Sequence, residues 1–119
     1  MANIRMSRIN AEIQKCIAEI INGKINNPNI AGMIVSINKV DTAPDLSISK
    51  VYVSILGNKS EQQSCFNAIS SMNKFIRHEL AHMIRLKTVP ELVFIYDTSV
   101  EEGQRILDLI DKIHGDSNE

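Results

Sequence analysis

The sequence predicts a single α+β domain in which helices cover a three-stranded sheet. Three observations lead to this fold class: a length of 119 residues, segments with apolar residues at helical spacing, and three short apolar runs typical of strands. Of the residues, 44% are apolar and 23% are charged, which excludes collagen-like, disordered and disulfide-scaffold classes. We expect the domain to occupy residues 3–114, with a tail over 115–119.

The first half of the chain predicts a helix followed by a hairpin. Apolar residues over 3–22 recur every three or four positions, which is typical of a helix with one buried stripe. Two runs rich in Ile and Val, 32–41 and 46–56, are separated by turn residues and predict paired strands. Ser60, with Gln63 three residues later, is a capping-box pattern that begins a second helix.

The second half predicts two further helices around a third strand. Helical spacing continues over 74–87 and stops before Pro90, because the residue before a proline is pushed away from helical geometry. Residues 92–96 form an apolar strand, and a last helix follows over about 98–113. The predicted order is therefore helix, strand, strand, helix, helix, strand, helix.

The cysteine and aromatic residues are expected in the core. Cys16 and Cys65 lie in apolar patterns, with no second sulfur nearby that would complete a metal clip. No run is apolar enough to span a membrane and the N-terminus shows no export signal, so we expect a cytoplasmic protein. The aromatic residues fit core positions better than a base-stacking platform: Tyr52, Phe66, Phe75, Phe94 and Tyr96.

Charge is divided unevenly along the chain. Thirteen Lys and Arg against fourteen Asp and Glu give a formal net charge of −1. Residues 1–90 hold eleven basic and six acidic side chains, whereas residues 91–119 hold two and eight. Because binding of an anionic partner depends on the local field, the basic part of the chain is a candidate surface for RNA. We expect the acidic part to face away from RNA.

Three stretches of the chain resemble the ribosome-binding factor A family: residues 5–21 (RMSRINAEIQKCIAEII), 44–57 (PDLSISKVYVSILG) and 89–113 (VPELVFIYDTSVEEGQRILDLIDKI). The resemblance implies a type II KH-like fold and a bacterial small-subunit assembly factor. Such a factor binds the small ribosomal subunit and its rRNA transiently during late assembly and rRNA processing. It needs neither catalysis nor a cofactor. We expect a monomer with no membrane partner.

In that family the two middle helices meet at a kink with a small-x-Gly sequence. The corresponding stretch here is Met72-Asn73-Lys74, which departs from the pattern because it contains no glycine. A kink can still form at this stretch, since asparagine tolerates left-handed backbone geometry better than other non-glycine residues do.

The helical segment after this stretch carries the first candidate surface for RNA. On a helical wheel one sector holds Lys74, His78, Ala81 and Arg85, flanked by Arg77 and His82, with Lys87 following. Cations one turn apart can each reach a phosphate, which orients a protein on RNA and makes binding salt-dependent. A plain solvated face is the alternative interpretation.

The first helix carries a second, weaker candidate surface. It holds Arg5, Arg8 and Lys15, and these cations share their face with Glu12 and Glu19. The acidic side chains offset the field of the basic ones, so a solvated face is an equally good interpretation.

His78, Glu79 and His82 also match HExxH, the helical pattern of zinc proteases. A catalytic zinc needs a third protein ligand, and the only other histidine, His114, lies near the C-terminus. We interpret the match as coincidental and predict no metal, with a zinc hydrolase as the most distant hypothesis. A non-enzymatic assembly factor is our first hypothesis, and a KH-like RNA-binding regulatory module unrelated to ribosomes is the second.

Overall fold

The computed structural model describes residues 4–99 and 106–110. Six elements follow one another, and their order confirms the predicted order as far as the third strand. The ends of the predicted domain, most of the last predicted helix and the predicted tail lie outside the described residues, although 106–110 are helical. The elements are α1 (Ile4–Gly23), β1 (Ile34–Thr42), β2 (Ile48–Leu56), α2 (Lys59–Ser71), α3 (Asn73–Met83) and β3 (Glu91–Tyr96).

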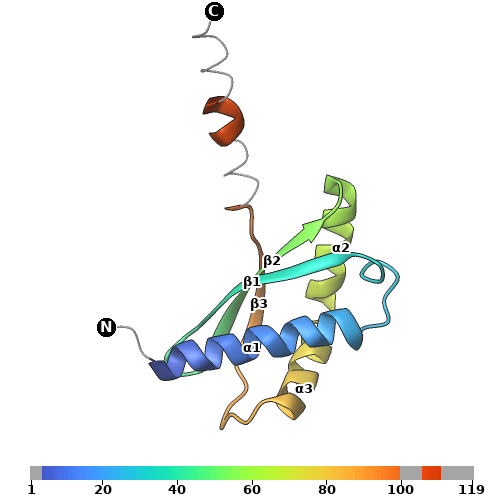
Figure 1. The fold of residues 1–119 in the computed structure, drawn as a ribbon. Helices are drawn as coiled ribbons and strands as arrows, with labels where there is room; N and C mark the ends of the chain where they lie inside the picture. Colours follow the sequence, from blue (N-terminus) through green and yellow to red (C-terminus); the bar gives the residue numbers. More distant parts are fainter. Residues whose placement is uncertain (1–3, 100–105, 111–119) are drawn as a thin grey trace, which may run out of the picture.

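The three strands form one sheet with β2 in the middle. β1 pairs antiparallel with β2, and a bulge between Ile37 and Lys39 shifts the register. β3 pairs parallel with β2 on the other side. A parallel neighbour requires a long crossover, which α2 and α3 provide. In Figure 1, α1 runs across the front of the sheet, while α2 and α3 follow one another beside it. This topology is the type II KH-like fold.

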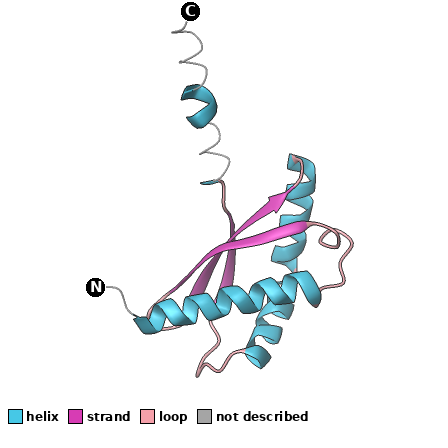
Figure 2. Ribbon diagram, viewed as in Figure 1, coloured by secondary structure: helices cyan, strands magenta, loops and turns pink. Residues whose placement is uncertain are grey.

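All three helices pack on one face of the sheet (Figure 2). Along β1 and β2 the buried residues alternate with more exposed ones, as expected when one face is covered. Isoleucine is the commonest core residue, and on α1 its spacing gives a continuous apolar stripe. The other side, which we call the open face, consists of the outward-pointing residues of the strands. Fully buried side chains of the core include Ile13, Ile17, Ile20, Val51, Val53, Ile69, Ile76 and Leu80.

The start of α2 corrects one prediction. Asn58, and not Ser60, caps the helix: its side-chain oxygen accepts the backbone N–H of Glu61 at 2.8 Å. The Glu61 carboxylate accepts the backbone N–H of Asn58 at 3.1 Å in return, which completes a capping box two residues before the predicted one. Gly57 precedes this cap with φ +152, an angle that favours glycine.

The cysteine prediction is confirmed, whereas the aromatic prediction holds for three of the five residues. Cys16 and Cys65 are buried free thiols, and burial raises the pKa of both above the ordinary value. None of the five aromatic side chains is fully buried. Phe75 is 37% exposed, and Tyr52 lies half-buried on the open face with Lys39 Nζ 5.7 Å from its ring centre. Phe66, Phe94 and Tyr96 are half-buried and pack against the core.

Candidate nucleic-acid interface

α3 separates an apolar face from a basic one. Ile76 and Leu80 are fully buried between the helix and the rest of the domain. The opposite side is exposed and carries most of the cations predicted for this segment. A shallow hollow of about 370 Å³ brings several of these residues together beside the loop that leads to β3. Its lining consists of Lys74, Arg77, His78, Ala81 and Val89.

The helix ends earlier than the sequence pattern predicted. α3 stops at Met83, and Ile84 has extended geometry with φ −118 and ψ 140. The wheel position predicted for Arg85 is therefore wrong, because Arg85 lies in the loop after the helix. Leu86 and Val89 of this loop pack against the core. The sequence therefore continues to place apolar residues at buried positions after the helix has ended.

The exposed cations of α3 and of the following loop form one candidate surface, which we call the α3 basic surface. The loop lies against α3 because the Arg77 guanidinium donates through Nη2 to the carbonyl oxygen of Val89 at 2.7 Å. Arginine has five N–H donors, so this bond leaves others for a ligand. The α3 basic surface consists of Lys74, Arg77, His78, His82, Arg85 and Lys87, all exposed.

The junction between α2 and α3 lies at Met72. This residue has φ −96 and ψ 17, and the helices end and begin on either side of it. The junction does not use left-handed geometry, since Leu46 is the only described non-glycine residue with positive φ. Asn73 acts through its side chain: Nδ2 donates to the carbonyl oxygen of Leu92 at 2.6 Å and so ties the start of α3 to β3. Sequence reasoning missed this long-range bond.

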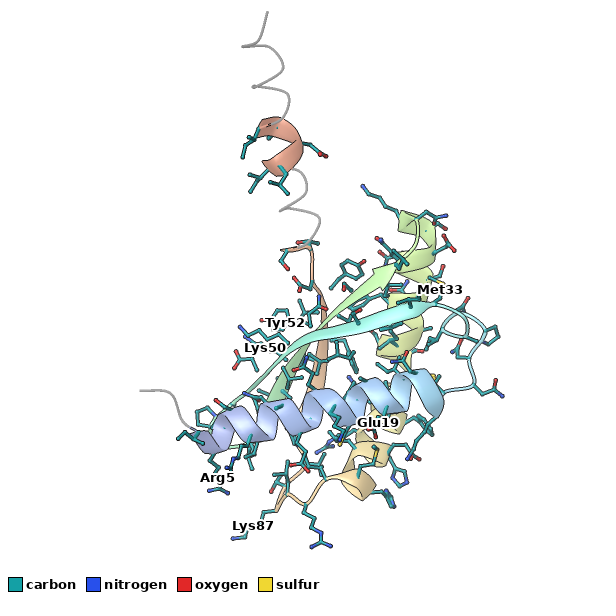
Figure 3. The ribbon with its side chains drawn as sticks, in the orientation of Figure 1. Arg5, Glu19, Met33, Lys50, Tyr52 and Lys87 are labelled. Atoms are coloured by element: carbon teal, nitrogen blue, oxygen red, sulfur yellow. The ribbon has the colours of Figure 1, made fainter. Side chains whose placement is uncertain are left out.

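The cations of α1 lie on a different element. Arg8 and Lys15 are exposed, as are Glu12 and Glu19 on the same helix, and none of them lines the hollow beside α3. Arg5 belongs to the first turn of α1. In Figure 3, Arg5 and Lys87 both project toward the lower edge of the molecule.

The HExxH residues do not converge on one point. Glu79 forms an ion pair with Lys24 at the end of α1, with 3.5 Å between Oε2 and Nζ. The rings of His78 and His82 lie 4.6 Å apart, and His82 Nδ1 is 2.9 Å from the carbonyl oxygen of His78. Within 4–99 and 106–110, no three His, Cys, Asp or Glu residues are placed to hold a metal ion. His114 is outside the described residues.

The α3 basic surface has little acidic compensation. The segment 73–90 contains four Lys or Arg residues and one acidic residue, Glu79. Glu79 pairs with Lys24, which lies outside this segment. The four Lys and Arg residues of 73–90 therefore face solvent with no other carboxylate in their own segment. Such a surface suits a polyanion whose charge is distributed along a backbone.

Comparison with known proteins places the chain among its relatives. The family model for Ribosome-binding factor A matches residues 5–110. The chain belongs to this family. The ribosome-binding factor A of Clostridium acetobutylicum is 39% identical over 115 residues, which cover 97% of this chain and 94% of that protein.

Two structures of the family from Thermus thermophilus share the fold. The crystal structure of ribosome-binding factor A matches with a TM-score of 0.66 and 21% identity, covering 76% of this chain and 93% of that one. A homology model fitted into the cryo-EM map of a 30S complex matches with a TM-score of 0.61 and 20% identity, covering 75% of this chain and 91% of that one.

In the described part of our chain, no helix is long and apolar enough to cross a membrane.

Proposed function

We propose that this protein binds the small ribosomal subunit and that its α3 basic surface contacts rRNA. The observation that carries the proposal is the set of uncompensated cations on one helix and its adjoining loop. The Thermus thermophilus relative, fitted into a map of a 30S complex, supports the choice of the small subunit as partner.

The α3 basic surface is built to recognise phosphates in a folded RNA. Lys74 and Arg77 come from the helix, and Arg85 and Lys87 come from the loop, so the charges spread over two elements. Phosphate contacts fix orientation and carry no base sequence directly. Recognition therefore depends on the shape of the rRNA, and binding favours the rRNA conformation that aligns its phosphates with these cations.

The protein acts as a non-enzymatic factor in ribosome biogenesis. It binds transiently during late assembly, promotes rRNA processing and maturation, and leaves the finished subunit. It works in the cytoplasm as a monomer and without a cofactor. We expect the acidic part of the chain, residues 91–119, to face away from rRNA, since Asp and Glu outnumber Lys and Arg there eight to two.

Sedimentation of cell extracts through a sucrose gradient tests the choice of partner. We expect the protein to migrate with free small subunits and to be missing from translating ribosomes. Migration only with other RNAs would overturn this assignment and favour an RNA-binding regulatory module unrelated to ribosomes.

A further inference from the structure

We infer that the helical segment 106–110 docks on the open face of the sheet within the same chain. Exposed large apolar side chains occur mainly in two parts of the described structure. One part is the open face, where Ile34, Leu56 and Val93 are exposed. The other part is the segment itself, which exposes Ile106, Leu107, Leu109 and Ile110. Two apolar surfaces in one chain gain free energy when they cover each other.

The open face offers a specific place for an aliphatic side chain. Ile34 and Leu56 are direct partners across β1 and β2, and their side chains are 62% and 69% exposed. They flank a hollow of about 400 Å³ at this end of the sheet, which we call the end hollow. It is lined by Ile34, Ser36, Ser54, Ile55, Leu56, Gly57, Gln62, Tyr96 and Asp97.

The chain leaves the sheet at the rim of the end hollow. Because β3 runs parallel to β2, its last residues lie at the same end of the sheet as Leu56. Asn38 holds Asp97 there, since its Nδ2 lies 2.8 Å from Asp97 Oδ2 and 3.1 Å from Ser54 Oγ. Asp97 also accepts the backbone N–H of Ser99 at 3.0 Å. The following residues therefore start beside the proposed docking place.

The connection to the segment is long enough for docking. Eight residues lie between Asp97 and Ile106. At about 3.5 Å per residue they can span up to about 28 Å, so length does not keep the segment from the neighbouring hollow. The covalent link also makes docking intramolecular, which raises the effective concentration of the segment. In Figure 1 the segment stands beyond the end of β3, so docking requires it to fold back.

Nuclear magnetic resonance of the full, ¹⁵N-labelled chain tests the inference. Replacing Ile106 and Ile110 by Ser removes two apolar side chains from the segment. We expect the backbone amide signals of Ile34, Ser36, Ser54 and Leu56 to shift. The matched control Ile4→Ser changes an isoleucine on α1 that is 74% exposed, and it should leave those signals in place. Unchanged open-face signals in the double variant would overturn the inference.

The reciprocal variant Leu56→Ser tests the other side of the contact. We expect the amides of 106–110 to gain mobility on the picosecond to nanosecond timescale, seen as lower ¹⁵N order parameters. Repeating the measurements at a tenfold lower protein concentration identifies the occupant. If the signal differences between variant and parent persist on dilution, the segment docks within its own chain. If they vanish, the segment docks on a second copy of the chain, and the inference is overturned. No ribosome enters this experiment, so its outcome is independent of the proposed function.

Discussion

α1 and α3 both carry cations on exposed faces, yet the acids on the two helices differ in number and in pairing. On α1, Glu12 and Glu19 alternate with Arg8 and Lys15. In the segment 73–90, the single acid Glu79 is paired with Lys24. The number of cations is therefore a poor guide to an RNA surface, because neighbouring carboxylates decide how much field reaches the phosphates.

An ion pair also connects the end of α1 to α3. Lys24 follows the last residue of α1, and its ammonium group pairs with the carboxylate of α3. An exposed ion pair of this kind contributes little to stability. Its main consequence is local, since it draws the carboxylate of Glu79 toward the end of α1.

Charge reversal on the α3 basic surface should have the largest effect. We expect Lys74→Glu with Arg85→Glu to weaken binding to purified small subunits by about 100-fold, since each charged hydrogen bond contributes roughly tenfold. The matched control Lys50→Glu with Lys59→Glu makes the same change in net charge on exposed residues of the open face and α2. It should change affinity by less than about threefold. An equal loss in both variants would show that total charge, and not the α3 basic surface, governs binding.

Sequence reasoning captured those features of the fold that depend on local patterns. The apolar stripe of residues 3–22 correctly predicted α1, and the Ile and Val runs predicted β1 and β2 within two residues at each end. Helical periodicity failed at the end of α3. Ile84 has an extended backbone, and its side chain is buried just as it would be if the helix continued. An apolar residue type therefore predicts that a side chain is buried, and it does not by itself predict the backbone conformation.

The candidate site was predictable in composition and only partly in arrangement. Residue types and spacing indicated the cations of α3, which lie on one helix. The contacts that position them join distant parts of the chain: Asn73 bonds to Leu92, and Glu79 bonds to Lys24. Such pairs leave no periodic signal in a single sequence. The aromatic prediction failed for Tyr52 and Phe75, because residue type alone does not tell whether a ring lies on the covered or the outward face of its strand or helix.

Charge reversal on α1 should have a smaller effect than reversal on α3. We expect Arg8→Glu with Lys15→Glu to weaken small-subunit binding by about threefold to fivefold, because Glu12 and Glu19 already offset these cations. The assay is the same as for the α3 variant, at the same ionic strength. A loss as large as that of the α3 variant would place rRNA against α1 as well.

Removal of the Asn73 side chain should affect the α3 basic surface through its orientation. We expect Asn73→Ala to lower the free energy of unfolding by about 1 kcal/mol, measured by urea denaturation, because the carbonyl of Leu92 loses its side-chain donor. Binding should weaken only a few-fold. The matched control Asn67→Ala alters an exposed asparagine of α2 and should stay within about 0.5 kcal/mol of the parent. If both variants lose equal stability, the bond to β3 does not hold the junction.

The smallest effect should come from the acid within the basic segment. We expect Glu79→Gln to tighten small-subunit binding by at most about threefold, since it removes the only negative charge of 73–90. Lys24→Ala should weaken binding slightly, because it frees that charge from its partner. Unfolding free energies of both variants should remain within about 1 kcal/mol of the parent. Weaker binding by Glu79→Gln would mean that the carboxylate itself serves the interface.

The salt dependence of binding to purified small subunits tests the central claim most directly. Each phosphate contact contributes about 0.7 to 0.9 to the slope of log affinity against log salt. If Lys74 and Arg85 each contact a phosphate, their reversal to Glu should reduce that slope by about 1.4 to 1.8, and reversal of Lys50 and Lys59 should leave it unchanged. An unchanged slope in the Lys74 and Arg85 variant would contradict the claim that the α3 basic surface contacts rRNA.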